Sequence, residues 1–489
     1  MSLSHVVLSC KANWSHLRSM CILSARIAHS RAVSVTILVA SSGNVVDRVT
    51  QEVSRCTDIE QLDDFSKVRI VGLPSDGRDG RSLDDEFKLV WKALMDDKPV
   101  QCCYTSEEVE AVPRPSVVVL DLSWLEIIKS EQSSPPVFQW MMAFSGGFMH
   151  MCGPAQFGGR SGKPMSQESH DCEDRVDIPG MPSMTCRDLN PQDVGDKASK
   201  IHAAEATMTR FAERADGLLT ACAPEYDSAE CLDAISQWIG SHNDRKTFHL
   251  GPMLPLIRGT RTFSSKAIEI EINTCPEGLG TAVTHFLDEC LITNGNRSVI
   301  YISFGTEHCP QSSFRSSKIL AHAYPNAHTI SRLKSKYLGS CKAIISPFVP
   351  QQAILTHEAC GWFITHGGAN GVMEALTQGV PMIGWPFAID QPLNIAYMAR
   401  TLDAGFEFTK MRVDHCPLNI ENANNTPCDM GDWDGEVRGV LNMAFMETGR
   451  RKRENAVRIG ENLGQAWAEK DGRARLRLAE FLDLVNVSG

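Results

Sequence analysis

The sequence lacks a long hydrophobic run. No stretch reaches the roughly 18 consecutive apolar residues of a membrane-spanning helix, so we expect no transmembrane segment. The first residues lead into a short apolar run, His5–Cys10, without the charged segment and long apolar core of a secretory leader, so we expect no signal peptide. Repeats of solenoid length are also absent, which argues against a stacked-repeat architecture.

The chain is also short of positive charge and of patterned cysteines. Lys and Arg number 48 against 59 Asp and Glu, a net charge of −11, so it gains little by releasing counterions from DNA or RNA. We therefore expect no nucleic-acid partner. The 17 cysteines have no repeated spacing, which favours neither a disulfide framework nor a zinc site. Reduced thiols fit this pattern best, and a cytoplasmic location follows as an expectation.

What the sequence has is length and a regular alternation of patterns. Its 489 residues suffice for about two to three domains. In the first half, short apolar runs alternate with helical patterns, which predicts βαβ units and a parallel sheet. The predicted strands are residues 6–10, 33–40, 68–73, 117–120 and 217–221, and the predicted helices are residues 17–30 and 201–214.

A segment punctuated by Gly and Pro, which begins at His249, marks the predicted domain boundary. The alternation restarts after it, with strands predicted at residues 298–304 and 343–348 and helices from residue 437 to 485. Before it, residues 145–192 are rich in Gly, Pro and Ser, and we expect a long loop region there. The predicted divisions are an N-terminal domain over 1–248, a linker over 249–276, a second domain over 277–470 and a C-terminal helix over 471–489 that packs back on the first domain.

The most informative segment runs from Phe348 to Gln391. An apolar strand pattern, Gly361–Thr365, leads into the glycine-rich turn His366–Gly371, and a helical pattern follows at once. This arrangement directs free backbone N–H groups and the positive end of a helix toward an anion. A histidine in the turn and the later Asp390–Gln391 pair suggest a phosphate that carries a polyhydroxylated group.

The same segment resembles the donor-binding signature of the family 1 UDP-glycosyltransferases. The match is long and without gaps, and it is weaker elsewhere in the chain. The matching residues are Phe348, Pro350, Gln351, Leu355, His357, Thr365, His366, Gly368, Asn370, Gly371, Glu374, Gly379, Val380, Pro381, Asp390 and Gln391.

The resemblance implies an α/β protein of GT-B fold, with two Rossmann-like domains whose parallel sheets face a central cleft. The first domain would bind a small lipophilic acceptor, and the second would bind a UDP-sugar. The implied reaction is an inverting hexosyl transfer that needs no cofactor and no metal ion.

A general base is predicted at His16. It follows the first strand and opens the first helix, at the sheet edge where open α/β sheets bind ligands, and imidazole accepts protons near neutral pH. Asp121 ends the strand 117–120 and could accept the other imidazole N–H. Both positions match catalytic residues of the family. A packing histidine and an aspartate that caps a helix are the ordinary alternatives.

The donor-binding roles come from the resemblance. The diphosphate would contact His366 and the turn that contains Gly368, Asn370 and Gly371, together with Gly305 and Thr306 after the strand 298–304. Glu374 would bind the ribose, Phe348 and Gln351 the nucleoside, and Asp390 and Gln391 the sugar, with glucose preferred.

Three positions depart from the family pattern. Phe348 replaces a tryptophan, Ala369 an aromatic residue, and Gly371 a serine whose hydroxyl contacts phosphate. These losses keep open an inactive UDP-sugar-binding or scaffold protein of the same fold. A dinucleotide-dependent oxidoreductase is disfavoured, because residues 11–16 lack the glycines of the G-x-G-x-x-G turn.

Overall fold

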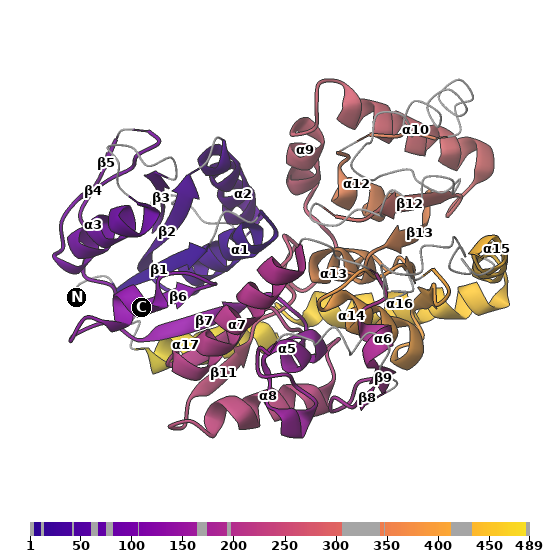
Figure 1. Ribbon diagram of the computed structural model, residues 1–489. Helices are drawn as coiled ribbons and strands as arrows, with labels where there is room; N and C mark the ends of the chain where they lie inside the picture. Colours follow the sequence, from indigo (N-terminus) through magenta and orange to yellow (C-terminus); the bar gives the residue numbers. More distant parts are fainter. Residues whose placement is uncertain are drawn as a thin grey trace, which may run out of the picture. The chain divides into compact units, whose positions relative to one another are not determined.

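The computed structural model describes residues 4–10, 14–41, 44–59, 67–74, 82–105, 107–163, 174–192, 197–305, 343–346, 348–411 and 433–485. These residues form two compact units (Figure 1). The first unit comprises Met1–Lys163, His202–Thr260 and Leu463–Gly489, and the second comprises Pro164–Ile201 and Arg261–Asn462. None of the described helices has the length and apolar character needed to cross a membrane.

The first unit is built on a parallel sheet of seven strands. Both faces of the sheet are covered, which is why its strands read as continuous apolar runs rather than alternating ones. In β1, for example, Val6 and Leu8 pack into one core cluster and Val7 into another. The strand order is β11 (Lys246–His249), β10 (Gly217–Thr220), β7 (Val137–Met141), β6 (Val117–Leu120), β1 (Ser4–Cys10), β2 (Val33–Ser41) and β3 (Val68–Pro74).

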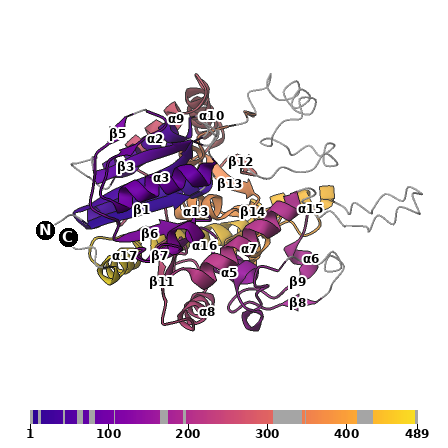
Figure 2. The ribbon, with the colours of Figure 1, turned by 60° about the vertical axis from the view of Figure 1, so that its left-hand side comes forward.

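Helices cover both faces of this sheet. On one face Phe87 and Trp91 of α3 belong to the same core cluster as Val7 of β1, and Figure 2 shows α3 in front of the strands. Elsewhere a short hairpin pairs β4 (Val100–Gln101) with β5 (Glu108–Val109). The helices are α1 (Trp14–Ser30), α2 (Val45–Ile59), α3 (Leu83–Met95), α4 (Leu125–Lys129), α5 (Ser145–Cys152), η3 (Ala155–Phe157), α7 (Ala198–Arg214, most of it in this unit), α8 (Ala229–Gly240) and α17 (Arg473–Leu484).

The last helix, α17, belongs to the first unit. Phe481 meets Phe138 of β7 and Phe248 of β11 edge-on, with ring centroids 4.9 and 5.6 Å apart. Before the helix, Trp467 lies 3.7 Å from the buried guanidinium of Arg26. The end of the chain therefore completes the core of the N-terminal sheet.

The second unit has a smaller parallel sheet, in the order β12 (Val299–Ser303), β13 (Cys360–Thr365), β14 (Met382–Gly384) and β15 (Gly405–Glu407). Its core contains Trp362, Ile364 and Trp385. A short hairpin pairs β8 (Arg175–Val176) with β9 (Met184–Thr185). The helices are α6 (Cys186–Leu189), α9 (Ser265–Asn273), α10 (Leu279–Asn294), α12 (Gln351–Thr356), α13 (Ala369–Thr377), α14 (Gln391–Ala396), η7 (Tyr397–Thr401), α15 (Trp433–Ala444) and α16 (Glu447–Gln465).

Two predictions of local structure are wrong. Residues 145–192 contain α5, which is wholly buried and whose Gly146 and Gly147 weaken the helical pattern. No strand forms over the described part of 343–348. There the Ser346 hydroxyl donates to the Phe348 carbonyl, 2.9 Å away, and such local bonds compete with a strand ladder.

The compact units also divide the chain differently from the predicted domains. Residues 164–201 group with the second unit rather than with residues 1–163. The division at residues 260 and 261 lies inside the predicted linker, 249–276. The functional assignment of the domains stays a prediction.

Candidate active site

In the first unit the structure brings His16 and Asp121 together. β1 and β6 are parallel neighbours, with Ser9 opposite Leu120, so the residues that follow them lie at the same edge of the sheet. His16 Nδ1 lies 2.8 Å from Asp121 Oδ2. The carboxylate is nearly buried, with its side chain 4% exposed, whereas the imidazole is 24% exposed.

The backbone fixes both members of this pair. The Asp121 N–H donates to the Ser9 carbonyl at 3.0 Å, which ties the aspartate to the end of β1. The Ser19 hydroxyl donates to the His16 carbonyl at 2.7 Å, and the indole N–H of Trp140 donates to that hydroxyl at 3.0 Å. An ionised carboxylate can only accept a hydrogen bond, so Nδ1 of His16 must carry the proton in this contact. In the neutral imidazole Nε2 is then the nitrogen that can accept a proton. The contact is the one expected from the sequence, and its catalytic role stays a prediction.

Cys10 is a less suitable reactive group at the same edge. Burial, and then the negative charge of Asp121, raise the pKa of its thiol well above the usual value. The thiolate is the nucleophilic form of cysteine, so a thiol held neutral is inert. His16 is therefore the better candidate for proton transfer here.

In the second unit, three glycines shape the turn around His366. Gly305 and Gly367 have φ angles of +71° and +87°, which favour glycine. A Cβ added at Gly305 would stand 2.8 Å from His366 Cε1, and one at Gly368 would stand 2.6 Å from Nε2. The imidazole is thus held between two backbone segments that any larger residue would push away.

The helix after this turn begins without a side-chain cap. Gly368 is the N-cap of α13, which carries Asn370 and Gly371 in its first turn. Gly368 has no side chain with which to cap the helix, and the first backbone N–H groups and the helix dipole suit an anion such as a phosphate. Thr306, the remaining predicted phosphate contact, lies outside the described residues.

Glu374 lies behind the turn and is only 1% exposed. The Gln351 Nε2 donates to its Oε2 at 2.5 Å, and the Gln352 Nε2 donates to its Oε1 at 2.6 Å. The Tyr301 hydroxyl donates in turn to the Gln351 Oε1 at 3.0 Å. Both oxygens of the proposed ribose ligand are therefore oriented by glutamine side chains.

Sequence reasoning missed three members of this network: Tyr301, Gln352 and Glu271. The Glu271 carboxylate of α9 accepts from the backbone N–H groups of Gln352 and Ala353, at 3.2 and 3.0 Å. It thereby satisfies the N-terminus of α12, which carries both glutamines. Glu271 falls in a weakly patterned stretch, so nothing in the sequence pointed to it. Gln352 could have been identified, because it follows the predicted nucleoside ligand Gln351 directly in the sequence.

The remaining donor-site predictions lie near the end of the segment and at its start. Gln391 is 4% exposed, and its Oε1 accepts from the N–H groups of Phe387 and Ala388 at 3.1 and 3.4 Å. Its Nε2 is left as the group to meet a sugar hydroxyl. Asp390 Oδ2 accepts from Asn394 Nδ2 at 2.8 Å. Phe348 is 44% exposed and so has an accessible ring. Over the described ranges, no group of three or more His, Cys, Asp or Glu side chains could hold a metal ion.

Two solved structures share this fold over nearly the whole chain. One is UGT2 of Phytolacca americana complexed with UDP-2fluoro-glucose and pterostilbene, with a TM-score of 0.68, 14% identity and 99% of each chain covered. The other is a UDP-glucose: anthocyanidin 3-O-glucosyltransferase in complex with UDP, with a TM-score of 0.67, 16% identity and 100% of each chain covered. The chain therefore has the GT-B fold, as expected.

Sequence comparisons find similarity to one family. Residues 281–415 match the family model described as UDP-glucoronosyl and UDP-glucosyl transferase. The chain is 28% identical over 334 residues to UDP-glycosyltransferase eriJ of Hericium erinaceus, which covers 62% of each protein. It is 26% identical to baicalein 7-O-glucuronosyltransferase of Scutellaria baicalensis, over 47% of this chain and 54% of that protein. The chain is therefore similar to the family 1 UDP-glycosyltransferases, and it spans between half and two thirds of the length of these relatives.

Proposed function

We propose that this protein transfers glucose from UDP-glucose to a hydroxyl group of a small lipophilic acceptor. The observation that carries the proposal is the hydrogen bond of 2.8 Å between His16 Nδ1 and the buried Asp121 carboxylate. It supplies an oriented base at the carboxyl edge of a parallel sheet, where such folds bind ligands. Similarity to the UDP-glycosyltransferases supports the donor class, and the small acceptors named for the relatives and solved structures support the acceptor class.

In the proposed reaction, His16 Nε2 accepts the proton of the acceptor hydroxyl as its oxygen attacks the anomeric carbon. Asp121 stabilises the imidazolium that forms and keeps the ring in one tautomer. The bond from the anomeric carbon to the diphosphate oxygen breaks on the opposite face of the sugar. The glycoside therefore has the inverted configuration, and UDP leaves with the bonding electrons.

The leaving diphosphate would be stabilised by His366 and by the N-terminus of α13. Fixed donors and a helix dipole at the position of developing charge are an effective source of transition-state stabilisation. Because these groups belong to the chain itself, we propose a reaction without a metal ion. Glu374 would bind the ribose, and Asp390 with the Gln391 amide would bind the sugar hydroxyls.

The alternative of an inactive UDP-sugar-binding protein is not carried forward. The His16–Asp121 hydrogen bond is in place, and the departures at Ala369 and Gly371 remove donor contacts rather than the base. The proposed cytoplasmic location rests on the cysteines. The 12 cysteines within the described ranges are free thiols.

The proposed function is tested by incubating the protein with UDP-glucose and a library of hydroxylated small molecules. Parallel incubations with UDP-galactose and UDP-glucuronate test the sugar. We expect products heavier than an acceptor by one hexosyl group, with the β configuration by NMR, and UDP release that requires the acceptor. UDP bound tightly without any glycoside across the library would contradict the proposal.

A further inference from the structure

A group of charged side chains lies beside the proposed base in the first unit. β1 and β2 are parallel neighbours, so α1 and α2 begin at the same edge of the sheet. Arg18 Nε donates to Glu52 Oε1 at 3.2 Å. Arg55 Nη1 donates to Glu52 Oε2, also at 3.2 Å. The single buried carboxylate of Glu52 is therefore already paired with two arginines.

A third arginine, Arg48, is attracted by the same Glu52 carboxylate, whose hydrogen bonds go to Arg18 and Arg55. Its guanidinium carbon lies 3.9 Å from the centroid of the Trp14 ring, and no acceptor among the described residues lies within hydrogen-bond distance of its side chain. Burial lowers the pKa of Arg48, although a guanidinium stays charged at neutral pH. The neighbouring Asp47 accepts a hydrogen bond from the Tyr104 hydroxyl instead.

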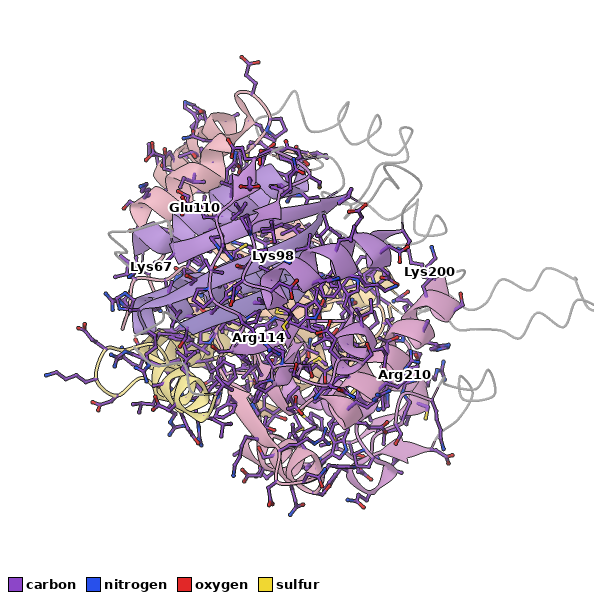
Figure 3. All side chains as sticks on the ribbon, turned by 90° about the vertical axis from the view of Figure 1, so that its left-hand side faces the viewer. Lys67, Lys98, Glu110, Arg114, Lys200 and Arg210 are labelled. Carbon is purple, nitrogen blue, oxygen red and sulfur yellow. The ribbon has the colours of Figure 1, made fainter. Side chains whose placement is uncertain are left out.

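Two other basic residues of the first unit show the contrast. Lys98 and Arg114, labelled in Figure 3, lie in the segments after α3 and before β6, and both have partners. Lys98 Nζ donates to Asp96 at 2.9 Å, and Arg114 Nη2 donates to the Ser133 hydroxyl at 3.1 Å. Arg48 therefore carries a positive charge whose hydrogen-bond donors are unused, at an edge that also holds the proposed base.

We propose that Arg48, stacked on Trp14, binds a carboxylate of the acceptor, so that the enzyme selects hydroxylated carboxylic acids. The guanidinium fork matches a carboxylate with two parallel hydrogen bonds, and the indole ring fixes its plane. This proposal rests on the proposed function, because it names the class of acceptor for His16.

Helical geometry sets the general shape of such an acceptor. Trp14 and His16 are two residues apart at the start of α1, so the guanidinium stacked on Trp14 and the imidazole lie at the same end of this helix and project from different sides of it. An acceptor that meets both groups therefore needs its carboxylate and its reacting hydroxyl at opposite ends of an extended molecule. A hydroxyaryl acid such as p-hydroxycinnamate has this shape.

The test compares p-hydroxycinnamate with its methyl ester, which keeps the shape and hydroxyl and removes the charge. Calorimetric binding of each, with saturating UDP, is measured for the wild type, Arg48→Gln and Arg48→Lys. Arg114→Gln is the matched control, because it removes the same charge elsewhere on the same unit. Glucosyl transfer to the ester is followed in parallel by mass.

We expect the wild type and Arg114→Gln to bind the acid at least about tenfold more tightly than the ester. Arg48→Gln should weaken binding of the acid and leave binding of the ester unchanged, so that the ratio of the two affinities approaches one. Arg48→Lys should keep part of the preference for the acid. The preference should also shrink with added salt. Equal binding of acid and ester by the wild type, an unchanged ratio in Arg48→Gln, or no binding of either compound would overturn the proposal.

The two proposals fail separately. Transfer to the ester without a preference for the acid would leave the glycosyltransferase intact and refute the role of Arg48. Binding of the acid through Arg48 without any transfer would refute the proposed function and keep the anion site.

Discussion

Gly371 offers the sharpest test of how the donor site is built. The residue is in the first turn of α13, where the resemblance to the family implies a serine that contacts phosphate. A Cβ added there would lie 3.5 Å from Phe363 Cε1 and 3.8 Å from Gln351 Nε2 and Thr365 Oγ1. These are ordinary van der Waals distances, so the structure has room for a serine without rearrangement.

Two effects are expected from Gly371→Ser, and they are separable. Replacing glycine inside a helix stabilises the fold by about 0.5–1 kcal/mol, because the unfolded chain loses freedom. A hydroxyl that donates to a charged phosphate adds about 1.5 kcal/mol or more to binding, which is about tenfold in UDP affinity. Gly371→Ala should show the first effect alone.

The assay is calorimetric titration of UDP into the wild type, Gly371→Ala and Gly371→Ser, with urea denaturation of each. We expect both variants to be more stable than the wild type and only the serine variant to bind UDP more tightly. If Gly371→Ser binds UDP no better than Gly371→Ala, α13 does not hold the diphosphate as we propose.

Three further predictions follow from other contacts. Asp121→Asn removes a charge about 4 Å from the imidazolium, worth about 4 kcal/mol at an effective dielectric of about 20, so kcat should fall about a thousandfold while UDP still binds; a fall below tenfold would contradict the role of the carboxylate. Gln352→Leu removes a donor from buried Glu374 and should weaken UDP binding about tenfold, with kcat little changed at saturating donor; an unchanged Kd would show that this hydrogen bond is dispensable. Burial lowers the pKa of three histidines of the first unit, and since they charge only on unfolding, stability should fall by about 1.4 kcal/mol per pH unit for each as pH drops from about 6.5 toward 4. They are His5 with a pKa of about 3, His150 of about 3 and His249 of about 4. Urea midpoints that are equal at pH 7 and pH 5 would refute this last prediction.

Patterns local in the chain made much of the fold and site predictable. The residues that follow two neighbouring parallel strands lie at the same edge of the sheet. The contact between His16 and Asp121 was therefore predictable from the two apolar runs that precede them. The strand, turn and helix around His366 were predicted because glycine, histidine and the helical pattern lie within 18 residues, from β13 to α13.

Contacts between distant segments were not predictable in this way. Glu271 and Gln352 are in contact although they are 81 positions apart in the sequence. Arg48 contacts Trp14 because α1 and α2 begin side by side. The helix α5 was missed because burial, rather than periodicity, holds a segment that contains two adjacent glycines. Tertiary packing determines the secondary structure of such segments, and a single sequence contains little information about tertiary packing.

The central claim is that His16 is the base of a UDP-glucose-dependent transfer. Its most direct test is the transfer rate of His16→Ala with UDP-glucose and an acceptor found in the library screen, with UDP affinity measured on the same sample. We expect transfer to be abolished while UDP binds as in the wild type. Turnover by His16→Ala comparable to that of the wild type would contradict it.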